Sequence, residues 1–232
     1  MKTIGLIGGT SWYSTAGYYK TINQLVNERL GRSHSAKILL YSLDFQDYHA
    51  LQEADRWDDV ELLFSGLAIK LEQAGADCML LCANTPHIIA DKLIKKLGIP
   101  FIHIADETAK EIKKDGKKKV LLLGTKFTME NTFFTDRLKK QGIEAIVPDA
   151  EERIIIHNAI VNEFTKGIFT KEIKSRYQSI IKDSIKKGAE GVVFGCTEIA
   201  LLLKPEESDL PVYDTAFIHS KAAVDFALDS AF

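Results

Sequence analysis

Two stretches of this 232-residue chain decide its fold: residues 75–86 read GADCMLLCANTP, and residues 188–199 read GAEGVVFGCTEI. Each begins with a glycine that follows a helical pattern and continues into an apolar run. Eight positions after the glycine stands Ala83 in the first stretch and Cys196 in the second. A short continuous apolar run is typical of a strand buried on both faces of a parallel sheet. The two stretches therefore predict two similar strand ends.

The similarity extends to a second landmark upstream. One apolar run ends in Gly8-Gly9-Thr10, and another ends in Gly124-Thr125. Thr10 precedes Ala83 by 73 residues, and Thr125 precedes Cys196 by 71. This agreement predicts two related α/β halves. Chance likeness is the alternative, because strands of α/β proteins share composition.

Apolar runs alternate with helical patterns from end to end, which predicts an α/β protein with mainly parallel sheets. The predicted strands are Thr3–Gly8, Ile38–Leu43, Cys78–Cys82, Phe101–Ile104, Val120–Leu123, Ala145–Val147, Gly191–Phe194 and Val212–Tyr213. The predicted helices are Tyr18–Leu30, Asp58–Ala74, Thr108–Lys114, Asn131–Gln141, Glu151–Phe164, Lys171–Lys187 and His219–Leu228. We expect residues 1–98 with 206–232 to form one lobe and residues 99–205 to form the other.

Composition narrows the class of partner. Thirty basic and 32 acidic side chains give a formal net charge of −2, which does not favour nucleic acid or an anionic membrane and leaves a small molecule as the expected partner. The chain starts with a strand pattern rather than a signal peptide, and its apolar runs are far shorter than a membrane span, so we expect a cytoplasmic protein. Three cysteines do not form a disulfide framework or a zinc spacing, and we expect no metal.

Ligands of open α/β sheets bind at the carboxyl ends of the strands. If the two halves face each other across a pseudo-twofold axis, residues 83–85 and 196–198 approach one small molecule from opposite sides. Groups on both sides of a carbon atom can remove a proton from one face and return it to the other. The repeat therefore predicts an active site between the lobes that is suited to inversion.

Several segments resemble, in order and spacing, the motifs of the aspartate/glutamate racemase superfamily, above all its aspartate and broad-specificity amino-acid racemase branch. These segments are Ile4–Trp12, Cys82–His87 and Phe194–Ile199, with supporting matches elsewhere along the chain. The resemblance implies a racemase that needs neither pyridoxal phosphate nor another cofactor. It also implies two Rossmann-like lobes, a homodimer, and aspartate, glutamate or another polar amino acid as the substrate.

The resemblance implies one acid/base cysteine at the end of each half. Cys196 matches the second, and we expect a helix N-terminus after it to lower the pKa of its thiol; a buried structural cysteine is the alternative. Ala83 stands at the first position, where a methyl group cannot transfer a proton. Cys78 and Cys82 are expected to pack in the core, because successive side chains of a strand point to opposite faces.

The resemblance further implies a substrate-binding set of Thr10, Gln52, Asn84, Thr85, Thr125, Lys166, Thr197 and Glu198. In this set Gln52, in a loop, and Lys166 would hold the distal group of the substrate. The alternatives are caps for the threonines that end strands and for Glu198, a turn for Asn84, and a surface position for Lys166. His87 and His103 are more typical of packing than of a base.

Ala83 leaves three functions open. The first is an amino-acid racemase with Cys196 as its one thiol, impaired or atypical because the first catalytic position is alanine. The second is a one-thiol decarboxylase or other lyase, as in relatives that resemble this fold. The third is a carboxylate-binding protein on the same scaffold. We place the racemase first, because the substrate-binding residues are retained and only one proton carrier is missing.

Overall fold

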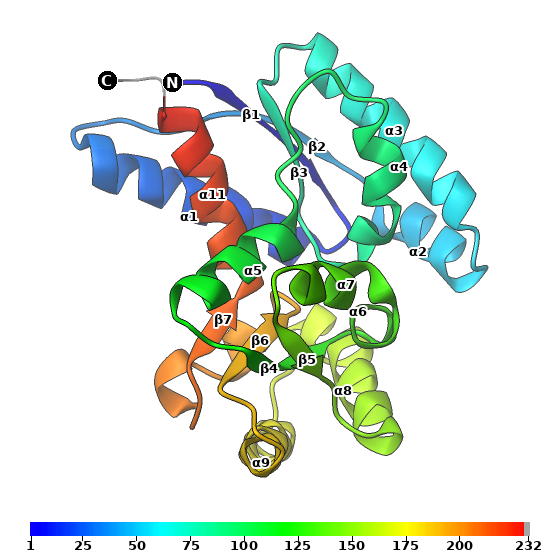
Figure 1. Cartoon of the computed structure of the whole chain (residues 1–232). Helices are drawn as coiled ribbons and strands as arrows, with labels where there is room; N and C mark the ends of the chain where they lie inside the picture. Colours follow the sequence, from blue (N-terminus) through cyan, green and yellow to red (C-terminus); the bar gives the residue numbers. More distant parts are fainter. Residues whose placement is uncertain (230–232) are drawn as a thin grey trace. The chain divides into compact units, whose positions relative to one another are not determined.

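The structure of the chain, a computed structural model, describes residues 1–229, which form two compact units. Unit 1 contains residues 1–103 and the segment that begins at His219, and unit 2 contains Ile104–Ile218. Each unit has one parallel sheet with helices on both of its faces (Figure 1). The predicted α/β class with two lobes is confirmed, while the pseudo-twofold relation stays a prediction.

The sheet of unit 1 has the order β2-β1-β3, with β1 at Thr3–Gly8, β2 at Lys37–Ser42 and β3 at Cys78–Leu81. The helices of this unit are α1 (Trp12–Leu30), α2 (Phe45–Glu53), α3 (Trp57–Gln73), η1 (Thr85–Ile89), α4 (Ala90–Ile94) and α11 (Thr215–Leu228, from His219 onward). Ile7, Met79 and Leu81 pack with α3 on one face. On the other face lie α1 and α11, joined by a hydrogen bond between Tyr18 and His219 (Figure 1).

The sheet of unit 2 has the order β5-β4-β6-β7, with β4 at Lys119–Gly124, β5 at Glu144–Ile146, β6 at Gly191–Gly195 and β7 at Val212–Asp214. Its helices are α5 (Ile104–Lys114), α6 (Lys126–Glu130), α7 (Thr132–Lys140), α8 (Ala150–Asn162), η2 (Phe164–Lys166), α9 (Lys171–Lys186), α10 (Ile199–Leu202) and η3 (Pro205–Glu207). The first three strands of each sheet therefore share one order, second-first-third, as expected for a repeat.

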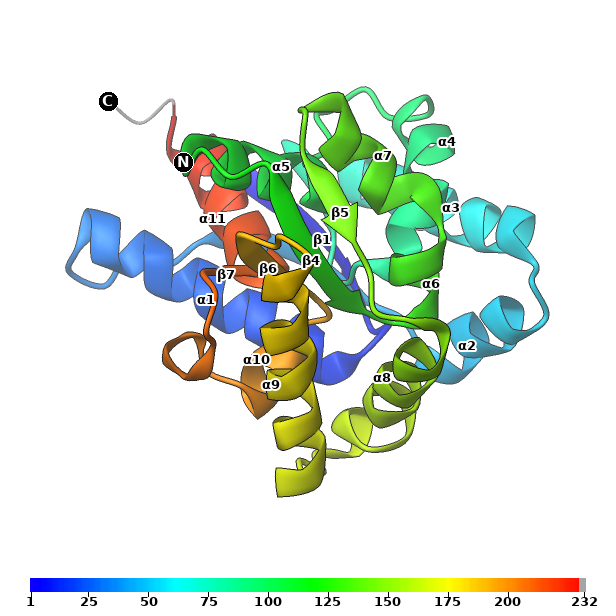
Figure 2. The same ribbon diagram turned by 60° about the horizontal axis from the view of Figure 1, so that its bottom comes forward.

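Strand β4 shows why its sequence is a continuous apolar run. Leu121 and Leu123 pack in the cluster that contains residues of α8 and α9, whereas Val120 and Leu122 pack in the cluster that contains residues of α5 and α7. Figure 2 shows these two pairs of helices on the two sides of β4 and β6. Because helices cover both faces, every position from Val120 to Gly124 is buried and alternation disappears.

Two predicted elements are wrong. The run Phe101–Ile104 is not a strand: Phe101 forms an isolated bridge with Met79, and Ile104 begins α5. Its apolar character reflects burial in a connection, which pairs with β3 at Met79 alone, and in a helix start. The loop expected around Gln52 is helix α2, which the carboxylate of Asp44 caps by accepting a hydrogen bond from the Gln46 amide at 2.9 Å.

The lobe boundaries differ from the expected ones. Strand β7 pairs with β6 in the second sheet, so residues 206–218 belong to unit 2 and not to the first lobe. Residues 99–103 belong to unit 1, where the Ile102 amide donates to the Met79 carbonyl at 3.0 Å. Strand pairing thus sets both boundaries. The last part of the predicted first lobe, residues 230–232, lies outside the described residues.

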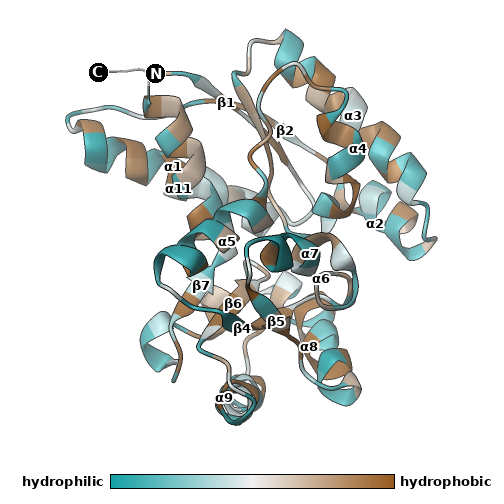
Figure 3. Cartoon of the chain, in the orientation of Figure 1, coloured by the Kyte–Doolittle hydropathy of each residue, from teal (hydrophilic) through white to brown (hydrophobic). Residues whose placement is uncertain are grey.

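Hydropathy follows the layers of each unit. Figure 3 shows brown and teal alternating along α3, as expected for a helix with one face against a sheet and one face in solvent. Among the described helices, none combines the length and apolarity that crossing a membrane requires.

Candidate active site

Thr10 lies at the carboxyl edge of the first sheet, directly after β1. The preceding Gly9 has a φ of +89°, and a Cβ there would lie 2.1 Å from the Leu43 carbonyl oxygen, so only glycine fits this turn. Thr10 is 8% exposed, and its hydroxyl is buried without a hydrogen-bond partner in the described part of the chain. A buried hydroxyl of this kind is available to a bound polar group.

Residues 83–85 follow β3 at the same edge. Ala83 is partly exposed, Asn84 and Thr85 are buried, and Thr85 begins η1. Thr10 and this segment are therefore brought to one edge by neighbouring parallel strands, as predicted. The side chains of Thr10, Ala83, Asn84 and Thr85 are all neutral, so these four positions offer amide and hydroxyl groups and neither an acid nor a base.

Two residues of α1 that the sequence reasoning missed hold this edge in place. The Ser14 hydroxyl donates to the Cys82 carbonyl at 2.6 Å, and the Gly9 amide donates to the Thr15 hydroxyl at 2.9 Å. Both lie in the first turn of α1, where Ser11 caps the helix by accepting from the Ser14 amide at 3.3 Å. Polar residues in a helix start directly after Gly-Gly-Thr were the available signal.

Thr125 and Cys196 leave the second sheet at the same level, because Gly124 and Gly195 lie opposite each other in β4 and β6. The Thr125 hydroxyl accepts a hydrogen bond from the Thr128 amide at 3.3 Å and so caps α6. Capping was the alternative role for Thr125, and the structure bears it out.

Cys196, Thr197 and Glu198 form a compact polar cluster after β6. The Cys196 thiol donates to Oε2 of Glu198 at 3.1 Å, and the Thr197 hydroxyl donates to the same oxygen at 2.6 Å. Cys196 is 9% exposed and Glu198 is 4% exposed. The carboxylate expected to bind substrate therefore accepts hydrogen bonds from its two neighbours.

The expected direction of the Cys196 pKa is wrong. Burial raises the pKa of this thiol well above its usual value, and the nearby Glu198 carboxylate raises it further, while amide hydrogen bonds oppose the rise. Helix α10 has only four residues, so its dipole is too small to reverse these effects. At neutral pH Cys196 therefore carries its proton.

A buried phenol, that of Tyr177, packs in the same cluster as Cys196. The Tyr177 pKa is raised well above its usual value, mainly by burial and then by Cys196 and Glu163. Its hydroxyl has no hydrogen-bond partner within the described residues. Tyr177 thus stays neutral beside the thiol.

The other cysteines and two histidines behave as expected. Burial raises the pKa of the Cys82 thiol and raises that of Cys78 to about 12, so both stay protonated in the core. His87 and His103 are 1% and 3% exposed, with ring centroids 4.6 Å apart. Both are buried rings rather than exposed bases.

The two residues expected to hold the distal group lie in different units. Gln52 is half-buried on α2 in unit 1. Lys166 is exposed at the end of η2 in unit 2. Their shared role stays a prediction.

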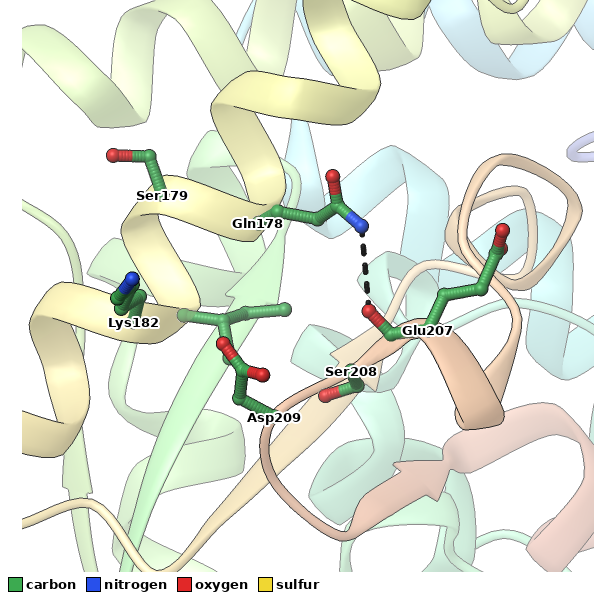
Figure 4. Close-up of a pocket in the computed structure, with 7 residues that line it drawn as sticks. Gln178, Ser179, Lys182, Glu207, Ser208 and Asp209 are labelled. Atoms are coloured by element: carbon green, nitrogen blue, oxygen red, sulfur yellow. Dashed lines mark hydrogen bonds between the residues drawn. The ribbon is translucent and has the colours of Figure 1, made fainter.

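Unit 2 also has a cavity of about 320 Å³ between α9 and the loop after η3 (Figure 4). Its lining residues are Gln178, Ser179, Ile181, Lys182, Glu207, Ser208 and Asp209. The predicted site residues are absent from this lining. Among the described residues, no group of three or more His, Cys, Asp or Glu side chains is arranged to hold a metal ion.

Comparison with known proteins finds similarity to one protein family and to a curated relative. The model of the Asp/Glu/hydantoin racemase family matches residues 7–223. The broad specificity amino-acid racemase RacX of Bacillus subtilis (strain 168) is 25% identical over 224 residues, which cover 95% of this chain and 96% of RacX.

Solved structures agree over nearly the whole chain. A Yersinia pestis protein assigned to the Asp/Glu racemases is 45% identical with a TM-score of 0.93, covering 98% of this chain and 100% of that one. An aspartate racemase homologue from Pyrococcus horikoshii OT3 is 35% identical with a TM-score of 0.86, covering 98% and 99%. The aspartate racemase of Picrophilus torridus, at 23% identity, a TM-score of 0.75 and coverage of 100% and 94%, shares the fold.

Proposed function

The chain belongs to the Asp/Glu/hydantoin racemase family, and we propose that it is a cofactor-independent racemase of aspartate, glutamate or another polar amino acid. The family is enzymatic, and its relatives are named for amino-acid racemisation. The observation that carries the proposal is the Cys196–Glu198 hydrogen bond at a strand end, because it joins a proton donor to a proton acceptor.

In this proposal the two units supply different parts of the chemistry. Unit 2 supplies the acid/base: the Cys196 thiol passes its proton to Glu198, and the resulting thiolate takes the proton from Cα. The electron pair of the broken C–H bond moves into the substrate carboxylate. Unit 1 supplies neutral groups that hold this carboxylate, namely Thr10, Asn84 and Thr85, because hydroxyl and amide groups stabilise the charge that develops there.

The second proton transfer needs a donor other than residue 83. We propose that, for inversion, water protonates the carbanion on the face that Ala83 leaves without a thiol, and the hydroxide formed takes the proton from Glu198, so that Cys196 keeps the proton from Cα and the cluster returns to its starting state. For retention, Cys196 returns its proton to Cα on the original face and recovers a proton from Glu198. A positioned acid or base contributes about 10² to 10⁴-fold. Inversion is therefore expected to be slower than proton exchange on the Cys196 face.

Gln52 and Lys166 are proposed to contact the distal group, Thr197 to contact the substrate, and Thr125 to act through its loop. The family resemblance supports these roles, together with the positions of Thr125 directly after β4 and of Thr197 shortly after β6. A homodimer and a cytoplasmic location are proposed on the same basis.

Deuterium exchange tests the function directly. Each L- and D-amino acid is incubated with the protein in deuterium oxide, the α-proton signal is followed by NMR, and the enantiomers are separated by chiral chromatography. We expect fast exchange with retention and slower exchange with inversion for a polar amino acid. The Cys196→Ala variant is expected to lose all exchange.

Three other outcomes would contradict the proposal. Undiminished exchange in Cys196→Ala would place the chemistry elsewhere in the chain. Binding of amino acids without any exchange would favour a carboxylate-binding protein. Release of CO2 from a substituted malonate, in place of exchange, would favour the one-thiol decarboxylase, which the single thiol at Cys196 also suits.

A further inference from the structure

The backbone of the segment after β3 is held from the protein interior by a histidine. Nδ1 of His87 lies 2.9 Å from the Ala83 carbonyl oxygen and 3.2 Å from the Asn84 carbonyl oxygen. Carbonyl oxygens only accept hydrogen bonds, so Nδ1 must carry the hydrogen. The two carbonyls therefore fix the tautomer of His87, and His87 in turn fixes two consecutive peptide groups.

A second side chain continues this arrangement by one residue. The Ser14 hydroxyl donates to the carbonyl of Cys82 at 2.6 Å. Buried side chains thus bind three consecutive carbonyl oxygens, those of residues 82, 83 and 84. With these oxygens directed at Ser14 and His87, the peptide planes of the segment are fixed in orientation.

His87 is itself held firmly within unit 1. It is 1% exposed, and its ring packs against those of Phe101, His103 and His219 at centroid distances of 5.6, 4.6 and 5.6 Å. His219 is fixed at both nitrogens, at 2.9 Å from the Tyr18 hydroxyl and 2.7 Å from the Ile102 carbonyl. The donor that holds the segment therefore has little freedom to move.

We propose that His87 is a positioning residue, which sets the backbone of residues 83–85 so that their polar groups meet the substrate. This inference rests on the proposed function for its consequence in binding, and on the hydrogen bonds alone for its effect on the backbone. Nothing in the role requires His87 to touch the substrate or to change its protonation state.

A matched pair of variants separates positioning from packing. His87→Asn replaces the ring but keeps a donor nitrogen close to the place of Nδ1, whereas His87→Leu removes the donor. Both lose ring packing, so both are expected to unfold at similarly lowered temperatures. If His87→Leu does not fold, His87→Phe, which keeps a ring and lacks the donor, takes its place.

The first measurement needs no activity: amide hydrogen exchange of the peptide 82–90 in the full chain without substrate, read by mass spectrometry. We expect exchange in this peptide about tenfold faster in His87→Leu than in the wild type, and restored to within about threefold in His87→Asn. Equal exchange in the two variants would reduce His87 to a packing residue.

The second measurement applies to whichever amino acid shows α-proton exchange. KM is expected to rise about tenfold in His87→Leu with kcat changed less than about threefold, and to recover in His87→Asn. A fall in kcat alone, unrelieved by asparagine, would overturn the role in binding. A wild-type protein without activity would contradict the proposed function while the hydrogen-exchange result still decides the role of His87.

Discussion

The first three strands of the two sheets have the same order, but different chemical groups follow them at the carboxyl edges. In unit 1 the first and third strands end in a hydroxyl, a methyl group and an amide, all neutral. In unit 2 the third strand ends in a thiol that donates to a carboxylate. The difference shows that the strand order of a repeat can be retained where the side chain at the strand end is not, because the backbone depends on glycines and buried hydrogen bonds and not on residue 83.

The hydrogen bonds that hold the residues at these two edges differ as well. Unit 1 holds its segment with Ser14 and with His87, whose ring makes edge-to-face contacts with two other buried imidazoles. Unit 2 holds Cys196 through Glu198, with the buried Tyr177 nearby. One edge is thus held through its backbone carbonyls, and the other through hydrogen bonds between its side chains.

The largest expected effect on activity comes from giving both strand ends a cysteine. Ala83→Cys places a thiol at the partly exposed tip of unit 1, and a second proton carrier is expected to raise the rate of inversion about 10²-fold, within the range for a positioned acid or base. Chiral chromatography gives the rate, and KM is expected to stay within about threefold. A folded variant with an unchanged rate of inversion would show that this tip does not face the reacting carbon.

The next effect concerns His219 in unit 1 and the dependence of stability on pH. Burial lowers the pKa of His219 to about 4, against about 6.5 in the unfolded chain. The unfolded chain therefore takes up the proton first as the pH falls, and about 3 kcal/mol of stability is lost between about pH 6.5 and pH 4.

Urea unfolding at a series of pH values measures this loss, with His219→Gln as the control, since glutamine does not titrate. The difference in stability between wild type and variant is expected to shrink as the pH falls through this window. A difference that stays constant with pH would mean that His219 does not titrate on unfolding.

The smallest effect separates two proposed contributions of Glu198 in unit 2, its negative charge and its acceptance of a proton from Cys196. Glu198→Gln removes the negative charge, so the pKa of the Cys196 thiol is expected to fall and alkylation by iodoacetamide to become faster at a given pH. Exchange at Cα is nevertheless expected to slow about tenfold, because the thiol has lost its proton acceptor. Glu198→Asp, which keeps a carboxylate at this position, serves as the control. Exchange that rises together with alkylation would limit Glu198 to an electrostatic role.

Sequence reasoning succeeded where local pattern and burial agree. Strand β1 was predicted at Thr3–Gly8 as observed, and Gly75 and Gly188 have φ values of +99° and +87°, as residues that end helices require. It failed at Phe101–Ile104, because burial in a connection gives the same apolar run as burial in a sheet. It failed at the lobe boundary for a different reason: the sequence of β7 does not indicate that this strand pairs with β6.

The sequence by itself determined the alternation of strands and helices, the repeat of two strand ends, and the identity of the groups that follow them, including the alanine at 83. These depend on hydrophobic period and on residue type, which are local properties of the chain. Only the tertiary structure decided that Glu198 turns to Cys196, that His87 turns to the Ala83 carbonyl, and that the thiol pKa is raised. The reason is that burial and hydrogen-bond partners arise from segments distant in the sequence and from side-chain directions, neither of which residue type specifies.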